Sequence, residues 1–255
     1  MRNWMLPLLL LIAVIAPASF GEDAPLTAKS SVDDVLKALQ SRGQNLKDFT
    51  ADVSQKMTDP ITLHETTEKG KVFFQRLPDG DTRIRVNFDR KKTGTRPEVK
   101  WHREYLLAKG TLVDQDFDGK SENRHQVAKP GQKMDPLKLG EGPFPLPIGQ
   151  EPAEVKKNFD VSIVPADKDD PANTIHAVLK PKPGTRFARK YDEIDVWVDL
   201  QSHFTPRIQA TQLHAAEIDT TDLTNLQINK GLSDADFTLA PPGKGWSVSE
   251  DALQD

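Results

Sequence analysis

The chain has 255 residues, a formal net charge of −4 at pH 7 and no cysteine. Without cysteine, disulfide bonds, thiolate metal sites, a cysteine nucleophile and a lipid-modified cysteine are all excluded. The mildly acidic balance does not favour electrostatic capture of nucleic acid, so no nucleic-acid partner is expected.

The N-terminal residues predict a secretory signal peptide over residues 1–21. Arg2 precedes an almost wholly apolar run, Leu6–Ala16, and small residues follow that run. The run is shorter than the roughly 20 residues that a membrane span needs; a retained anchor is the alternative. Cleavage after Ala18 and cleavage after Gly21 both fit, and the second is preferred because a proline stands just before Ala18. We therefore expect an exported, periplasmic protein.

The first element expected in the mature chain is an amphipathic helix. Apolar residues recur with the spacing i, i+3, i+4, i+7, which places on one stripe Val32, Val35, Leu36 and Leu39. Ser31 and Asp34 have the spacing of a capping box, and Gly43 is expected to end the helix. The stripe must pack against another element.

A half-buried strand follows at residues 46–57, LKDFTADVSQKM, where apolar and polar residues alternate. One face of this strand carries Phe49, Ala51, Val53 and Met57.

Two hairpins are predicted next. Gly70–Gln75 and Thr82–Phe88 flank the turn signal Asp79-Gly80, and in the second strand Ile84, Val86 and Phe88 share a face. The second hairpin joins Trp101–Leu107 to Thr111–Val113 through Lys109-Gly110, and another turn is expected at Asp118-Gly119. Between the hairpins, the basic cluster Arg90, Lys91 and Lys92 is expected to form a solvated turn.

The centre of the chain, Lys129–Pro152, is rich in proline and glycine and predicts an irregular crossover. A short helix is expected at Glu154–Asn158. Alternating or β-branched content then predicts four strands, at Thr174–Leu179, Glu193–Leu200, Arg207–Leu213 and Asp222–Asn229. We expect one domain, residues 22–255, with a proline-rich insertion near 129–152; a division into two domains at that insertion is the alternative.

Several segments resemble the outer-membrane lipoprotein carrier (LolA) family. The family's first strand has roughly the pattern Leu-x-x-Phe-x-Ala-x-Phe-x-Gln, which is matched here by Leu46, Phe49, Ala51 and Gln55. Val53 replaces the second aromatic residue. Three further segments are similar and occur in the family's order: Gly70–Pro78, Tyr105–Leu112 and Asp236–Val248.

The match has departures. Arg76 corresponds to the family's arginine, although Leu77 is an extra residue before Pro78. Leu239 stands where the C-terminal motif has an aromatic residue. The chain is also longer than a typical carrier, chiefly through the central crossover and the segments Pro165–Pro171 and Pro181–Lys190.

The resemblance implies an α+β fold, in which a strongly curved antiparallel sheet forms an unclosed half-barrel and helices form a lid over its concave face. It implies a periplasmic carrier that shields lipoprotein acyl chains, receives cargo from an inner-membrane transporter and passes it to an outer-membrane acceptor. Arg76 would hold the lid closed. From the alternation and the resemblance, we expect a monomer whose apolar cavity is lined by Val35, Leu39, Val53, Phe74, Ile84, Val86 and Phe88.

Other sites are less well supported by the sequence. Asp114–Glu122 imitates the start of a calcium loop, but the twelfth position is His125 and the surrounding signals are strands, so a polar hairpin turn is preferred. Six scattered histidines show no helical metal spacing. No nucleophile, phosphate-loop or dinucleotide motif is present, so we expect neither enzyme activity nor a cofactor.

Three alternatives to a carrier stay open on the sequence. The same fold could serve an envelope sensor that detects mislocalised lipoproteins and signals to a membrane partner. A hydrolase of envelope lipids or glycans would need a carboxylate or histidine that no motif singles out. A structural envelope protein would have a filled half-barrel and no ligand, and Arg76 would then be an ordinary surface arginine.

Overall fold

The computed structural model describes residues 25–129, 131–139 and 148–252. The predicted signal peptide lies outside these described residues. Among them, no helix is long and apolar enough to cross a membrane.

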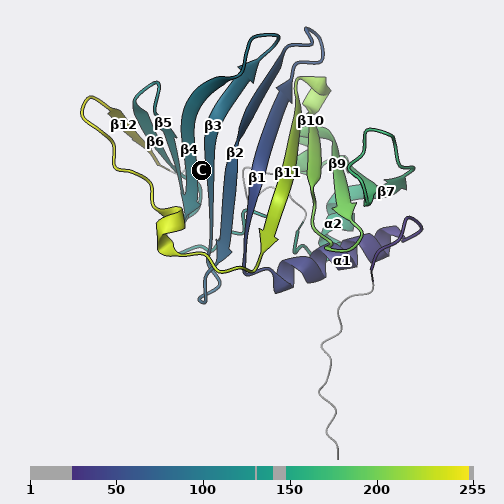
Figure 1. Cartoon of the computed structure of the whole chain (residues 1–255). Coiled ribbons are helices and arrows are strands. Elements are labelled where there is room, and N and C mark those ends of the chain that lie inside the picture. The colour runs from purple at the N-terminus through teal and green to yellow at the C-terminus, as the bar shows by residue number, and fades with distance from the viewer. Residues whose placement is uncertain (1–24, 130, 140–147, 253–255) are drawn as a thin grey trace, which may run out of the picture.

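Twelve strands form a single sheet in the order β12-β6-β5-β4-β3-β2-β1-β11-β10-β9-β8-β7. Neighbouring strands are antiparallel except β12, which pairs in parallel with β6. The two outermost strands, β12 and β7, do not pair with each other, so the sheet is unclosed (Figure 1). The strands are β1 (Asp48–Thr58), β2 (Glu65–Arg76), β3 (Thr82–Thr93), β4 (Val99–Ala108), β5 (Thr111–Asp116), β6 (Ser121–Gln126), β7 (Phe159–Val164), β8 (Thr174–Pro181), β9 (Tyr191–Asp199), β10 (Arg207–Gln212), β11 (Ile218–Ile228) and β12 (Ser247–Asp251).

Two α-helices accompany the sheet, α1 (Val32–Asn45) and α2 (Pro152–Asn158), with short 3₁₀ turns at Phe187–Arg189, Leu213–Ala215 and Asp234–Phe237. The predicted capping box of α1 is confirmed, because the Ser31 side chain accepts from the Asp34 backbone N–H while the Asp34 carboxylate accepts from the Ser31 backbone N–H. Figure 1 shows α1 lying across one end of the sheet. The predicted lid of helices over the concave face stays a prediction.

One hydrophobic cluster joins the sheet to its helices. Phe49 stacks on Phe74 at 5.5 Å between ring centroids and meets Phe204 edge-on at 5.1 Å. The predicted stripe of α1 contributes Val35, Leu36 and Leu39 to the same cluster. We call the sheet face that carries Phe49, Phe74 and the predicted residues of β3 the apolar face.

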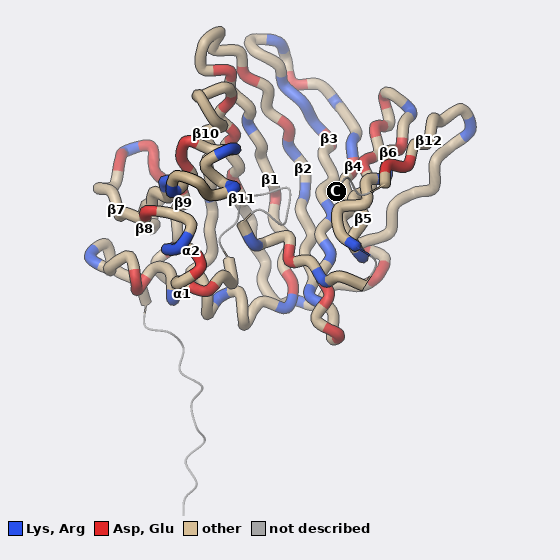
Figure 2. The backbone as a smooth tube through the Cα atoms, turned by 180° about the vertical axis from the view of Figure 1, so that it is seen from behind, with Lys and Arg blue, Asp and Glu red and all other residues tan. Residues whose placement is uncertain are grey.

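Both predicted hairpins are confirmed, and their strands are longer than expected. The solvated turn at Arg90–Lys92 is wrong: these residues lie within β3, and the turn follows at Gly94. Figure 2 shows the sheet from behind, with basic residues along this part of β3. A strand accommodates the basic run because neighbouring carboxylates pair with it, as Glu68 does with Lys91 at 3.1 Å.

The expectation that Gly43 ends α1 is also wrong, since the helix continues to Asn45. The glycine is there for a different reason. A Cβ at Gly43 would lie 2.2 Å from the Cα of Gly149, so the small residue permits a close approach between two segments.

The strands of the second half follow the prediction, with Ile194, Val196 and Val198 fully buried on one face of β9. Three strands were not predicted: β6, which follows the expected Asp118-Gly119 turn, β7 and the parallel edge strand β12. The C-terminal segment before β12 crosses the other face of the sheet. There, Arg83 Cζ lies 4.1 Å from the ring centroid of Phe237. The ring centroids of Trp246 and Phe117 are 5.1 Å apart. Trp246 thus packs the C-terminal segment against this face.

Candidate functional site

The residues predicted to line a cavity all lie on or against the apolar face. Each is at most 2% exposed and belongs to the same hydrophobic cluster: Val35, Leu39, Val53, Phe74, Ile84, Val86 and Phe88. The structure therefore brings the whole set together, although complete burial alone does not distinguish a ligand-binding wall from a filled core. Their role as ligand contacts stays a prediction.

A second group of residues, not predicted from the sequence, packs against this face. Residues 127–151, here named the crossover segment, contain neither helix nor strand where they are described. Leu137, Leu139 and Ile148 from this segment are almost completely buried in the same cluster as Ile84 and Val86. An alternating apolar pattern within the proline-rich stretch (Leu137, Leu139) was the only available signal.

The crossover segment is attached to the β2–β3 hairpin by polar contacts. Arg76 Nη2 lies 2.9 Å from Asp135 Oδ2, with both side chains partly shielded from solvent. The Thr82 hydroxyl donates to the Met134 carbonyl, and the Lys133 ammonium donates to the carbonyl of Asp79. Arg76 thus contacts the crossover segment rather than a helix.

The other end of the crossover segment is attached to α1. The Gly149 N–H donates to the Leu39 carbonyl at 3.0 Å, and Gly43 packs directly against Gly149. Because a hydrogen bond to a helical carbonyl requires close approach of the two backbones, a side chain at Gly43 would separate them. The helix and the described end of the crossover segment, residues 148–151, therefore pack together against the apolar face.

The apolar face becomes polar and aromatic toward β4 and β5. Tyr105 and Arg103 pair in register with Val86 and Phe88, so they share the apolar face. Arg103 donates two hydrogen bonds to Asp114, at 2.9 and 2.6 Å, and its guanidinium lies 5.2 Å from the Tyr105 ring centroid. This ion pair occupies Asp114, the first residue of the sequence that imitates a calcium loop.

Burial raises the pKa of Tyr105 to about 12, and the Asp114 carboxylate contributes further. Burial also raises the pKa of Tyr191, helped by Asp219. These are the two tyrosines of the chain. Since the unfolded phenol ionises near pH 10, the unfolded state loses protons first, and folding stability should fall as pH rises from about 10 to 12.

An alkaline titration followed by tyrosinate absorbance tests this directly. The native protein is expected to show less tyrosinate at pH 10 than the same protein in denaturant, which is expected to be about half ionised there. Coincident native and denatured titration curves would show that neither phenol is buried as described.

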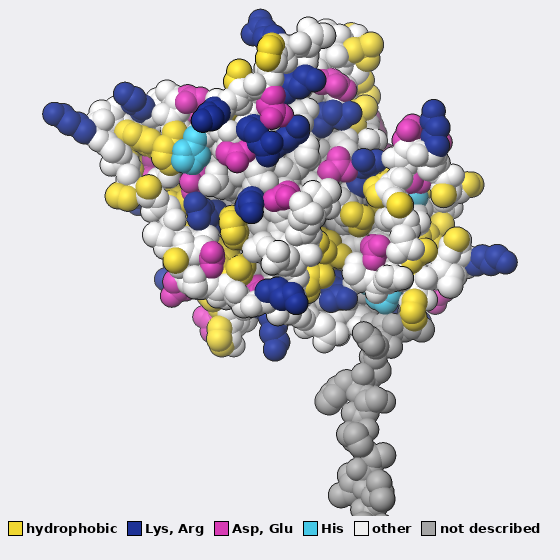
Figure 3. Space-filling view, in the orientation of Figure 1, with side chains coloured by type: hydrophobic (Ala, Val, Ile, Leu, Met, Phe, Trp, Pro, Cys, Tyr) yellow, Lys and Arg dark blue, Asp and Glu magenta, His cyan; other side chains and the backbone are white. Residues whose placement is uncertain are grey.

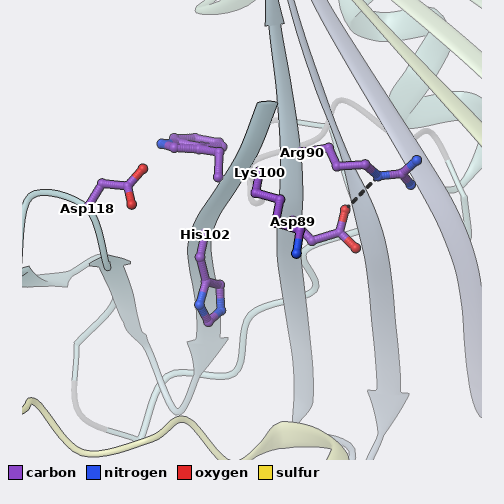
Figure 4. Close-up of a pocket in the computed structure, with 6 residues that line it drawn as sticks. Asp89, Arg90, Lys100, His102 and Asp118 are labelled. Carbon is purple, nitrogen blue, oxygen red and sulfur yellow. Dashed lines mark hydrogen bonds and ion pairs between the residues drawn. The ribbon is translucent and has the colours of Figure 1, made fainter. Parts of the chain in front are cut away.

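Figure 4 shows a pocket of about 400 Å³ at the ends of β3 and β4. Arg90 and His102 already have side-chain partners. Arg90 Nε donates to Asp89 Oδ1 at 3.0 Å, and His102 Nε2 lies 2.8 Å from Glu104 Oε1. Lys100, Trp101 and Asp118 complete the lining. We assign this pocket no function.

Three histidines, His102, His125 and His176, lie within ion-pair distance of a carboxylate. His176 stacks on Trp197 at 4.2 Å and places Nε2 2.8 Å from Asp195, under the 165–173 loop. No group of three or more His, Asp or Glu side chains suited to a metal ion occurs among the described residues. Asp118 and Gly119 lie in the turn between β5 and β6, as the preferred alternative to a calcium loop predicts.

No family model matches the chain, and no curated protein matches it in sequence. Similar solved structures include an uncharacterised conserved protein of Thermus thermophilus (TM-score 0.49, 10% identity, 86% of this chain and 98% of that chain). The MucA/MucB complex of Pseudomonas aeruginosa gives a TM-score of 0.47 at 11% identity, over 82% of this chain and 61% of that chain.

A LolA superfamily protein of Nitrosomonas europaea also matches, with a TM-score of 0.35 and 12% identity over 82% of this chain and 98% of that chain. The similar structures thus include the family that the sequence motifs resemble. At these identities and TM-scores, they assign no activity or ligand to this chain.

Proposed function

We propose that the protein binds the acyl chain of a lipoprotein, or of another lipid, on its apolar face and carries it across the periplasm without any chemical step. One observation carries the proposal. An unclosed sheet presents a continuous apolar face, and described residues of the segment packed on that face are attached to the sheet by surface polar contacts such as Arg76–Asp135. Such an arrangement suits a ligand that is taken up and released.

In this proposal, the acyl chain displaces the buried side chains of the crossover segment. Exposing Leu137, Leu139 and Ile148 costs roughly 5–9 kcal/mol at about 1.5–3 kcal/mol for each side chain. An acyl chain of about 16 carbons gains on the order of 10 kcal/mol on burial. The two values are of similar size, so uptake would be reversible, as a carrier requires.

The proposed lid consists of α1 and the crossover segment, with Arg76 as its latch through Asp135. A partly exposed ion pair contributes about 1 kcal/mol or less, and each hydrogen bond about 0.5–1.5 kcal/mol. Contacts of this strength hold a lid closed without making it permanent. An inner-membrane releasing transporter and an outer-membrane acceptor are the proposed partners of a monomeric carrier.

Arg76→Leu tests the latch. We expect the variant to bind a fluorescent palmitoyl probe at least several-fold faster than the wild type, because the lid opens more often, with less than about 1 kcal/mol lost from the free energy of unfolding. Stopped-flow mixing with the probe measures the rate.

Arg90→Leu is the matched control, since the ion pairs of Arg90 are with Asp89 and Glu98 and not with the described residues of the crossover segment. Its association rate should equal that of the wild type. Unchanged uptake and release in Arg76→Leu would refute the latch.

Purification of the protein from its native envelope, with identification of what co-purifies, distinguishes the alternatives. Enrichment of one membrane-bound regulator without bulk lipoprotein would favour a sensor. Turnover of a lipid or glycan that one carboxylate or histidine substitution abolishes would favour a hydrolase. Absence of any bound or bindable lipid would leave a structural protein with a filled core.

A further inference from the structure

The second half of β11 has a strand neighbour on one side only. β1 pairs with β11 as far as Phe49 and Ile228, whereas β10 pairs with it only from Ile218 to Asp222. In the part of the chain that the structure describes, the last hydrogen bond on the β10 side is donated by Leu223 N–H to the Pro206 carbonyl at 2.8 Å. Beyond it, no main-chain partner among the described residues pairs with residues 224–228 from that side.

A pocket of about 560 Å³ lies along this unpaired edge. Every residue from Leu223 to Ile228 lines it, and the opposite wall is mainly apolar: Pro171, Ala172, Phe204 and Pro206. In Figure 3, hydrophobic side chains reach the surface over the region between β11 and β9. The site thus combines unpaired backbone groups with an apolar wall.

This combination selects a class of ligand. An acyl chain would fill the apolar space and leave the strand edge without hydrogen bonds. An extended peptide satisfies both features, because its backbone pairs with the edge and its alternate side chains enter the pocket. Residues 224–228 match a segment of about five residues, roughly 17 Å long.

The end of the pocket nearest α1 is basic. Lys230 lines the pocket and is exposed, and Arg42 Nε of α1 donates to the carbonyl of the lining residue Ser202 at 2.6 Å. Neither cation forms an ion pair among the described residues. The nearby carboxylates are engaged: Asp199 accepts from Ser202 N–H and Asp48 accepts from Lys230 N–H. An acidic ligand group would complement the two cations.

We propose that an extended segment of a partner protein binds here as an added strand, antiparallel to β11 and in line with β10. Its aliphatic side chains occupy the pocket, and an acidic residue at its N-terminal end lies beside Arg42 and Lys230. The direction follows from β10, which runs away from α1 along the same edge. The site borders the apolar face, because Phe204 and Leu223 line the pocket and belong to the same hydrophobic cluster, but the inference does not depend on acyl binding.

The test uses a fluorescent peptide with the pattern Glu-Val-Thr-Val-Thr-Val, and fluorescence anisotropy measures its binding to the intact protein. Its matched control carries N-methyl groups at the alternate residues whose N–H groups would face β11. Losing two hydrogen bonds should weaken binding about tenfold or more. Replacing the glutamate by lysine should weaken it about two- to fivefold.

Protein variants locate the peptide. Ala172→Trp fills the pocket from an exposed position and should weaken binding at least about tenfold, while the palmitoyl probe of the preceding section should bind as before. Lys230→Glu should weaken binding about two- to fivefold, and Lys244→Glu, an exposed control outside the pocket, should have no effect.

The inference would be overturned by failure of the peptide to bind, or by equal binding of the N-methylated control. Peptide binding that Ala172→Trp and Lys230→Glu both leave unchanged would also overturn it. Circular dichroism of each variant verifies the fold; should Ala172→Trp not fold, the N-methylated peptide and Lys230→Glu still decide the outcome. Failure of the palmitoyl probe alone would count against the carrier function and not against this site.

Discussion

Replacing Gly70 with alanine is expected to lower the free energy of unfolding by about 3 kcal/mol or more. A Cβ at this position would lie 1.8 Å from the Asn87 carbonyl oxygen and 2.7 Å from the Phe88 Cα. Both are backbone atoms of the paired strand β3, so no side-chain rotation relieves the overlap. The register also shifts between Lys69 and Gly70, where the two strands are bent together.

Equilibrium unfolding in denaturant measures this change. Lys71→Ala is the matched control: Lys71 is the next residue of β2, its side chain is exposed, and its nearest ion-pair contact is 3.9 Å away. We expect the control to change stability by about 0.5 kcal/mol or less. A loss below about 1 kcal/mol in Gly70→Ala would show that the strands are not packed this closely.

Gly43→Ala is expected to destabilise the protein by about 2 kcal/mol, although alanine is the better helix former by about 1 kcal/mol. The new Cβ would lie 2.2 Å from Gly149 Cα, so either the crossover segment or α1 must move. The Gly149–Leu39 hydrogen bond would then lengthen or break. Because these segments form the proposed lid, uptake of the palmitoyl probe should also become faster.

Gln44→Ala provides the control for Gly43→Ala, as Gln44 is exposed in the same helical turn. It should raise or leave unchanged both the stability and the uptake rate. A gain in stability in Gly43→Ala would mean that Gly149 does not pack closely against α1. It would contradict the proposed attachment of the lid at this position.

Much of the sheet was predictable because the determining interactions are local. The alternation in β1, the Asp79-Gly80 turn and the Ser31–Asp34 capping box each depend on residues a few positions apart. The predicted face of Ile84, Val86 and Phe88 is confirmed as buried for the same reason. Period and turn chemistry determine which way a side chain points in a hairpin.

The incorrect predictions concern residues whose structure depends on a segment far away in the sequence. Gly43 has the composition of a helix terminator, but its neighbour is Gly149, 106 residues later, and no local pattern reveals that contact. Arg90–Lys92 has the composition of a loop, but pairing with β2 and β4 extends it as a strand. Tertiary pairing overrides propensity in both cases.

The candidate site likewise combines residues that a local pattern predicts with residues that it does not. Its sheet residues could be identified from alternation, whereas Asp135, Leu137, Leu139 and Ile148 lie in an irregular segment that has no period. The parallel strand β12 was missed because its five residues are all exposed and carry no hydrophobic signal. The unpaired edge of β11 depends on where β10 begins, which is a property of the preceding loop 200–206 rather than of β11 itself.

The most direct test of the carrier function is photolabelling of the wild-type protein with a diazirine-bearing palmitate, followed by peptide mapping. No substitution is needed, so misfolding cannot mimic the result. We predict one label per chain, attached to the segment Ile84–Phe88 or to Leu137–Leu139, and competed by unlabelled palmitate. Labels confined to the exposed side chains of Ile61 and Leu63 in the β1–β2 loop, or no saturable label, would contradict acyl binding on the apolar face.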